Sequence, residues 1–127
     1  MYNNQTVAIV DDDESVRMAI SSLVRSLGWQ ALTFATAREF LHSGSASGVA
    51  CVISDIQMPG MSGLDMQRAL IQAGILVPVI FITAFCTEAM RKQALECGAW
   101  SFLCKPVDGA AISECLEQLV RESARDP

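Results

Sequence analysis

The segment Val7-Ala8-Ile9-Val10-Asp11-Asp12-Asp13 joins a short apolar run directly to three consecutive acidic residues. Three later segments have the same arrangement, in which an apolar run stops at a polar residue that phosphate or metal chemistry can use: 49–55, 79–83 and 100–105. Short apolar runs separated by helical patterns are typical of buried strands in a parallel sheet. The four segments therefore predict four strands, each followed by a candidate functional side chain.

The polar residues at the ends of these runs are predicted to lie close together. In an open parallel sheet the carboxyl ends of the strands share one edge, and ligands bind in the crevice there. We therefore expect a single site built from distant parts of the chain, with three carboxylates, a hydroxyl and an ammonium: Asp11, Asp12, Asp55, Thr83 and Lys105.

Apolar spacing along the whole chain indicates five strand–helix repeats. Strands are expected at about 6–10, 29–34 and 50–54, with two more ending at Thr83 and Lys105, and a small-residue loop is expected at 42–48. Thr36 and Thr87 are candidate helix N-caps, and glycines follow several helical patterns as expected at helix ends. Right-handed crossovers then predict an α/β fold, a three-layer, doubly wound, five-stranded parallel sheet with helices on both faces.

Length and composition describe one folded domain. The chain has 127 residues, 51% of them hydrophobic, and can bury most of its apolar surface in one core. No apolar run approaches the roughly 20 residues of a membrane span. No secretory signal is visible, so we expect a cytoplasmic protein without membrane contact. We assign residues 1–120 to the domain and 121–127, which lack apolar periodicity, to the start of a linker or C-terminal tail.

Charge and cysteine content disfavour two kinds of function. The formal net charge of −5 argues against direct nucleic-acid binding, which needs a basic face. The five cysteines contain no C-x-x-C pair. We interpret them as small buried thiols in a reducing compartment, in preference to disulfides or zinc ligands.

Carboxylates at neighbouring strand ends indicate a metal site. Partly buried acids repel one another, and a divalent cation among them removes that cost. Oxygen ligands with room for water suit Mg²⁺, or Mn²⁺ in its place. Asp11, Asp12 and Asp55 are the candidate ligands, whereas Asp13 is expected only to cap the following helix.

The same edge would also suit phosphoryl transfer. Carboxylates attack phosphorus to form aspartyl-phosphates, so Asp55 is either a metal ligand alone or a nucleophile as well. The phosphoryl oxygens need positive charge and donors, which Lys105 and Thr83 would supply. Pro106 fixes a bend at the strand end, and the peptide bond before it is a candidate for the cis form.

Four stretches together resemble the receiver domain of two-component response regulators, most of all the nitrogen-fixation regulator type, in which a receiver precedes a helix-turn-helix output. They follow the order and spacing of that family: IVDD at 9–12, SDIQMPGMSG at 54–63, ITA at 82–84 and FLCKP at 102–106. Each stretch is weakly specific alone, and the four together are highly specific. The resemblance implies a flavodoxin-like (βα)5 fold with strand order 2-1-3-4-5.

The resemblance also implies roles for the matching residues around the metal. Asp55 would accept a phosphoryl group from a sensor histidine kinase. Asp12 would bind Mg²⁺ directly, Asp11 largely through water, and the backbone carbonyl of Gln57 would be a further ligand.

A phosphorylation switch is implied as well. Lys105 would pair with the phosphoryl group, and Thr83 would move to hydrogen-bond it. Phe102 would turn inward as Thr83 moves, or else serve as ordinary core packing. The surface of the fourth helix, fifth strand and fifth helix would rearrange, with a phosphorylation-dependent homodimer as the candidate readout. Such a domain catalyses only its own phosphorylation and dephosphorylation and is not otherwise an enzyme.

Two other classes fit the sequence poorly. A phosphohydrolase of the haloacid-dehalogenase type needs a second Asp two residues after the nucleophile, where this chain has Gln57. A flavodoxin-like electron carrier needs a phosphate loop where the acidic segment 11–14 would repel a flavin phosphate. Within the receiver class, the linker-like end favours the input half of a transcription factor. The alternative is a stand-alone receiver that acts in a phosphorelay or by protein binding.

Overall fold

All five predicted strands are present in the computed structural model, which describes residues 5–125. The elements are β1 (Thr6–Val10), α1 (Glu14–Ser26), β2 (Gln30–Phe34), α2 (Ala37–Ser43), the 3₁₀ helix η1 (Ala46–Gly48), β3 (Cys51–Asp55), α3 (Gly63–Gln72), β4 (Val79–Thr83), α4 (Glu88–Glu96), β5 (Ser101–Cys104) and α5 (Gly109–Arg125). Every strand pair is parallel, and the order is β2-β1-β3-β4-β5. The predicted fold class and strand order are confirmed.

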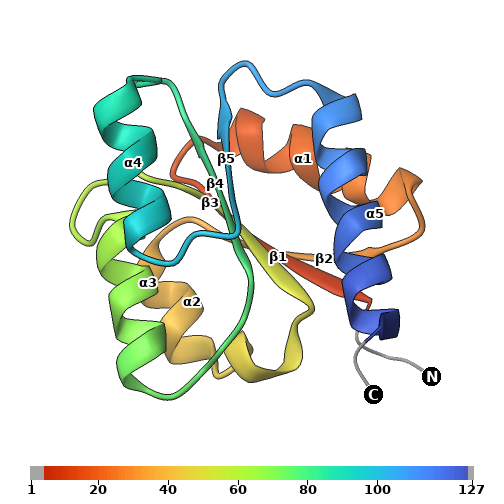
Figure 1. Ribbon diagram of the computed structural model, residues 1–127, viewed down its shortest axis with the longest axis horizontal. Helices are drawn as coiled ribbons and strands as arrows, with labels where there is room; N and C mark the ends of the chain where they lie inside the picture. The colour runs from red at the N-terminus through yellow and green to blue at the C-terminus, as the bar shows by residue number, and fades with distance from the viewer. Residues whose placement is uncertain (1–4, 126–127) are drawn as a thin grey trace.

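Helices cover both faces of the sheet and make the three layers (Figure 1). Helices α1 and α5 lie on one face, and α2, α3 and α4 lie on the other. Strands β3 and β4 are buried along their whole length, which explains why their sequences are continuous apolar runs and do not alternate. The short edge strand β5 is only partly buried.

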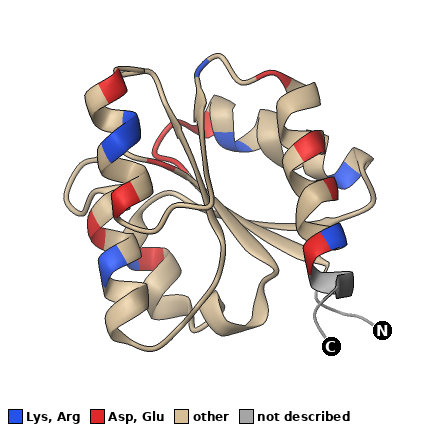
Figure 2. Ribbon diagram, in the orientation of Figure 1, with Lys and Arg blue, Asp and Glu red and all other residues tan. Residues whose placement is uncertain are grey.

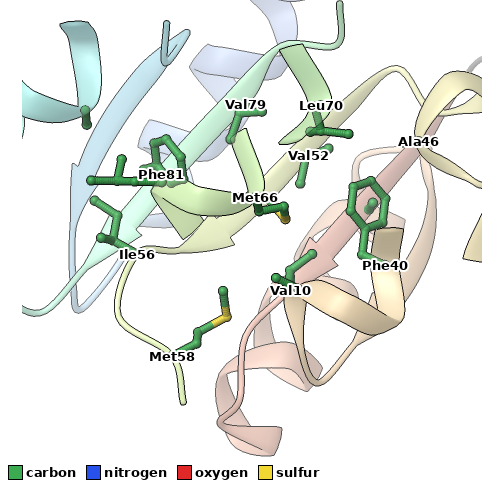
Figure 3. Close-up of a cluster of buried hydrophobic side chains, with 14 residues drawn as sticks. Val10, Phe40, Ala46, Val52, Ile56, Met58, Met66, Leu70, Val79 and Phe81 are labelled. Atoms are coloured by element: carbon green, nitrogen blue, oxygen red, sulfur yellow. The ribbon is translucent and has the colours of Figure 1, made fainter. Parts of the chain in front are cut away.

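Alternate residues of each strand feed two separate cores, because successive side chains point to opposite faces of a sheet. Val10 and Val52 enter the core beneath α2 and α3, where Phe40 and Met66 pack on them (Figure 3). The opposite face joins strand residues to α1 and α5: Val7, Ile9, Ile53, Ile80, Ile82, Ile20, Val24, Ile112 and Leu116. Burial of both faces holds the central strand ends in place.

Helix starts match the predicted caps. The hydroxyl of Thr36 accepts the N–H of Glu39 at 3.1 Å, and that of Thr87 accepts the N–H of Met90 at 3.1 Å. Each hydroxyl satisfies an N–H that has no partner inside the helix. Asp13 caps α1 as predicted, since its Oδ1 accepts from the N–H of Ser15 at 2.9 Å.

Two boundaries differ from the sequence interpretation. The predicted loop 42–48 is wrong in part, because α2 continues to Ser43 and η1 follows, with Ala46 buried against the core. Helix α5 continues to Arg125, beyond the predicted domain end at residue 120. That domain end stays a prediction. Across residues 5–125, none of the helices combines the length and apolarity needed to span a bilayer.

Candidate functional site

The carboxyl edge of the sheet brings the predicted site residues together. Asp11 directly follows β1, Asp55 ends β3, Thr83 ends β4, and Lys105 directly follows β5. The loop between β1 and α1 carries a continuous acidic stretch at this edge (Figure 2). One carboxylate oxygen from each of Asp11, Asp12 and Asp55 lies within 4.8 Å of the other two.

Lys105 bridges the two buried carboxylates. Its Nζ lies 3.1 Å from Asp11 Oδ2 and 3.1 Å from Asp55 Oδ2. The backbone N–H of Lys105 donates to the carbonyl of Thr83 at 2.8 Å, so the β4–β5 ladder holds the lysine in position. The Lys105–Pro106 peptide bond is cis, as the sequence suggested.

The two carboxylates keep Lys105 protonated. Burial by itself lowers the pKa of this ammonium, but the attraction of Asp11 and Asp55 and the hydrogen bond to Asp55 outweigh that effect and raise the pKa. The Lys105 side chain is 20% exposed, Asp11 is fully buried and the Asp55 side chain is 9% exposed. The positive charge is therefore fixed inside the site.

Asp11 has one oxygen that the protein does not satisfy. Its Oδ1 accepts the N–H of Asp13 at 2.9 Å, and Arg17 Nη1 donates to its backbone carbonyl at 2.7 Å. Its Oδ2 is buried and has no hydrogen-bond partner among residues 5–125, although it lies at ion-pair distance from Lys105. A buried acceptor left in this state is costly unless a further ligand reaches it.

Asp55 is held in a partly desolvated position. Its Oδ2 accepts from Lys105, its Oδ1 accepts the N–H of Gln57 at 3.3 Å, and Ser54 Oγ donates to its backbone carbonyl at 2.8 Å. Burial raises the pKa of Asp55, and the hydrogen bond and charge of Lys105 only partly offset that effect. Lys105 alone therefore does not fully stabilise the ionised form of Asp55, and a further positive charge would do so.

A divalent cation would supply that positive charge. Three carboxylates and one ammonium carry a formal net charge of −2 at the cluster. The unsatisfied Oδ2 of Asp11 supplies an oxygen ligand, and the exposed Asp12 leaves room for water. Oxygen donors with retained water suit Mg²⁺. The Gln57 carbonyl as a further ligand stays a prediction.

Thr83 and Phe102, the predicted switch residues, lie on neighbouring strands. Thr83 is fully buried, and its Oγ1 accepts the N–H of Phe85 at 3.0 Å. No hydrogen bond joins Thr83 to Asp55 within the described part of the chain. Phe102 is partly buried against the core beneath α2, α3 and α4. The switching roles of both residues remain predictions.

Sequence analysis missed the part that Gly63 plays in the site. A Cβ on Gly63 would collide with the backbone carbonyl of Asp55 and would lie 2.9 Å from Phe81 Cε1 and 3.1 Å from Ile56 Cα. Its N–H donates to the carbonyl of Ile56 at 2.8 Å. Helix α3 can therefore begin against β3 only because residue 63 has no side chain. The glycine that closes the 54–63 stretch was the available signal.

The prediction that all five cysteines are small buried thiols is wrong. Cys86 and Cys104 form a disulfide, and both residues are exposed. Cys51 is buried, whereas Cys97 and Cys115 are partly buried. The pair is 18 residues apart in sequence and meets because Cys104 lies beside Thr83 in the β4–β5 register, close to the loop that carries Cys86. Cysteine spacing alone does not reveal such a contact.

The fold and the acidic carboxyl edge together define a receiver domain. The family model described as the response regulator receiver domain matches residues 7–117, and the chain belongs to this family. Receiver domains of response regulators bind Mg²⁺ at an acidic pocket and interact with histidine kinases.

Curated relatives carry the names of regulators. Nodulation protein W of Bradyrhizobium diazoefficiens is 38% identical over 120 residues, which are 94% of this chain and 52% of that protein. Response regulator protein TmoT of Ectopseudomonas mendocina is 43% identical over 100 residues, 79% of this chain and 46% of that protein. Transcriptional regulatory protein FixJ of Azorhizobium caulinodans is 33% identical over 124 residues, 98% of this chain and 59% of that protein. The chain thus spans about half the length of these relatives.

Solved structures agree with the fold. The crystal structure of FixJ-N has a TM-score of 0.82 and 32% identity, with 94% of each chain covered. A receiver domain protein from Clostridium thermocellum has a TM-score of 0.86, covering 94% of this chain and 96% of that chain. Its identity of 24% supports the fold alone.

Proposed function

We propose that this domain is a phosphoacceptor switch, in which Asp55 takes a phosphoryl group from a sensor histidine kinase in a Mg²⁺-dependent reaction. One observation carries the proposal: a buried carboxylate at a strand end lies 3.1 Å from a lysine ammonium and within 4.8 Å of two further carboxylates. A structural ion pair needs one acid and one base. The surplus of acids suits a site that receives a cation and a phosphoryl group.

Asp55 would act as the nucleophile. A carboxylate oxygen forms the new O–P bond while the N–P bond of the donor phosphohistidine breaks and the imidazole leaves. Bound Mg²⁺, held by Asp11, Asp12 and Asp55, would neutralise charge on the phosphoryl oxygens. Lys105 stands beside Asp55 and would pair with a phosphoryl oxygen after transfer. Beyond this self-modification and its reversal, the domain would not be an enzyme.

Phosphoryl transfer to Asp55 would change the structure at Thr83 and in the loop before α4. The Thr83 hydroxyl now accepts from the N–H of Phe85, and turning toward a phosphoryl group would break that bond. Loss of the bond would free the loop before α4 and rearrange the surface of α4, β5 and α5. A homodimer through this surface is the expected consequence, which size-exclusion chromatography of free and phosphorylated protein would detect.

The output is proposed to be transcriptional. Relatives with the names "Transcriptional regulatory protein FixJ" and "Transcriptional regulatory protein TdiR" support this output, and the chain covers 59% and 46% of their lengths. The domain itself would act in the cytoplasm and would not contact nucleic acid, in keeping with its net charge of −5. A stand-alone receiver that passes on its phosphoryl group is the alternative.

Intact mass after incubation with acetyl phosphate and Mg²⁺ tests the proposal. We expect one phosphoryl adduct in the wild type and none in Asp55→Asn or without Mg²⁺. Asp65→Asn is the matched control, since Asp65 is an exposed aspartate paired with Arg68. An adduct that persists in Asp55→Asn would contradict the assignment. If the wild type takes no adduct, binding of beryllofluoride is measured next. A complex would mean that the phosphoryl group is hydrolysed too fast to detect, and no complex would mean that the site does not use phosphate.

A further inference from the structure

The disulfide lies directly beside the predicted switch residues. Cys104 is paired with Thr83 in the β4–β5 register and is followed by Lys105. Cys86 is in the loop after Thr83, between Phe85, whose N–H bonds the Thr83 hydroxyl, and Thr87, the N-cap of α4. The Cα atoms of the two cysteines are 5.7 Å apart. One covalent bond thus joins the loop before α4 to the strand end that carries Lys105.

This position makes the bond a restraint on the proposed switch. Movement of Thr83 toward Asp55 requires residues 84–87 to give up the present hydrogen bond from Phe85 to Thr83. With Cys86 tied to Cys104, that loop can shift only as far as β5 shifts with it. With the bond reduced, the loop would be held to β5 only by non-covalent contacts.

Exposure separates this pair from the other thiols of the chain. Both members of the pair are exposed, so a reductant in solution can reach the bond. Cys51 is buried, and burial raises its pKa to about 12, which keeps it a thiol. Only thiolates exchange with disulfides, so Cys51 does not compete for the pair.

We propose that Cys86 and Cys104 are a redox modification site, which in its oxidised form holds the loop 84–87 against β5 and disfavours the phosphorylated conformation of the switch. The effect on the switch rests on the function proposed above, whereas the modification itself does not.

The chemistry balances with a dithiol as reductant. One thiolate of the dithiol attacks a sulfur of the pair, breaks its S–S bond and forms a mixed disulfide. The second thiolate attacks that mixed disulfide, and the dithiol leaves as its own disulfide. Two electrons and two protons pass to Cys86 and Cys104. The reverse reaction with a disulfide oxidant restores the bond.

Thiol counting tests the modification site alone. The protein is equilibrated in oxidised or reduced dithiothreitol, unfolded in acid, and alkylated for intact mass and peptide mapping. We expect three alkylated cysteines in the oxidised form and five in the reduced form, with Cys86 and Cys104 as the two that change. Five alkylated residues in both forms, or a disulfide mapped to Cys97 or Cys115, would overturn the proposal.

Amide hydrogen exchange tests the restraint. We expect reduction to speed exchange of residues 84–90 by roughly tenfold, since local opening governs exchange in such loops. Cys86→Ser and Cys104→Ser should each exchange at the reduced rate under both conditions. Cys115→Ser, which leaves the pair intact, should respond like the wild type. Equal exchange in oxidised and reduced wild type would overturn the restraint.

The effect on switching is measured by beryllofluoride titration with Mg²⁺, in oxidised and reduced protein. We expect the reduced protein to bind roughly tenfold more tightly, because its bound conformation is more easily populated. Equal affinity in both forms would overturn the coupling and leave the proposed function intact. Absence of binding in both forms, together with no phosphoryl adduct, would reject the proposed function. Thiol counting and hydrogen exchange would still decide the modification site.

Discussion

At the ends of β1 and β3 the site residues are fixed by buried strands, whereas at the ends of β4 and β5 they adjoin exposed segments. Asp11 and Asp55, which we call the nucleophile half after the role proposed for Asp55, lie beside strands with fully buried interiors. Their carboxylates accept the backbone N–H groups of Asp13 and Gln57, and the Ser54 hydroxyl donates to the Asp55 carbonyl. The switch half consists of Thr83, the loop 84–87 and the end of β5. Here Phe85 is 56% exposed, and Cys86 and Cys104 are also exposed.

The difference indicates a division of labour. Metal binding and attack on phosphorus need atoms that keep their places, because small displacements of reacting groups are costly. Signalling needs a segment that can take up a second arrangement, and such segments come from the less stable parts of a fold. One sheet edge combines both, because buried strand ends at this edge lie next to the exposed loop after β4 and the exposed end of β5. Four experiments test this contrast.

Gly63→Ala should have the largest effect, because it breaks the nucleophile half. The new Cβ would collide with the Asp55 carbonyl, and the backbone on either side would have to shift. We expect the free energy of unfolding to fall by about 3 kcal/mol, although Ala normally favours a helix over Gly. Urea denaturation measures the change.

Gly48→Ala is the matched control for this substitution, since its added Cβ has no neighbour within 4 Å. We expect this variant to stay within about 0.5 kcal/mol of the wild type. Equal stabilities for the two variants would mean that α3 does not depend on its close approach to the strand.

Mg²⁺ binding at the nucleophile half should give the second largest effect, an increase in the stability of the folded protein. At a concentration about 100 times its dissociation constant, a ligand of the folded state adds about 2.7 kcal/mol of stability. We expect a matching rise in the thermal midpoint of the wild type, and little or none in Asp11→Asn, which loses the unsatisfied oxygen. Glu117→Gln, an exposed acid on α5, should respond as the wild type does. An unchanged response in Asp11→Asn would remove Asp11 from the ligand set.

Thr83→Ala should separate the two halves. Loss of the hydroxyl that accepts from Phe85 is expected to cost about 1 kcal/mol. The variant should still form the phosphoryl adduct on Asp55, because the nucleophile half is untouched. Hydrogen exchange of residues 84–90 should no longer change on phosphorylation. A normal exchange response would show that the signal leaves the site by another route.

The smallest expected effect is the pH dependence that Asp55 gives to the metal-free protein. Since burial raises its pKa above the ordinary value of 3.8, the folded state binds the proton more tightly than the unfolded state. Wild-type stability should therefore rise relative to Asp55→Asn as the pH falls from neutral through the raised pKa toward 3.8. Denaturation of both proteins across this range measures the difference. A gap that stays constant would mean that Asp55 is not strained by its burial.

Sequence patterns were informative about the strand ends and the helix caps, because both are marked by residues close together in the sequence. An apolar run followed by an acid specifies both a strand and its functional end, and parallel topology then brings Asp11, Asp55 and Lys105 to one edge. Asp13, Thr36 and Thr87 were likewise recognisable as caps, since a cap acts on residues two or three positions away.

Contacts between distant segments were not predictable in the same way. The approach of Gly63 to Asp55 depends on the angle at which α3 leaves the sheet edge. The meeting of Cys86 and Cys104 depends on the β4–β5 register and on the turn after Thr83. Neither contact produces a repeating pattern in the sequence. The cysteines were therefore interpreted from their spacing alone, and that interpretation was wrong for Cys86 and Cys104.

The bond between Cys86 and Cys104 also acts on the chain when it is not folded. It closes a ring of residues 86–104, which holds all of α4 and β5. Closing a ring of about this size lowers the conformational entropy of the denatured chain, which stabilises the folded state by about 3 kcal/mol at 25 °C. An oxidised molecule would therefore spend less time open to proteases than a reduced one. The redox state of this pair would then affect how fast the protein is degraded, in addition to how readily it switches.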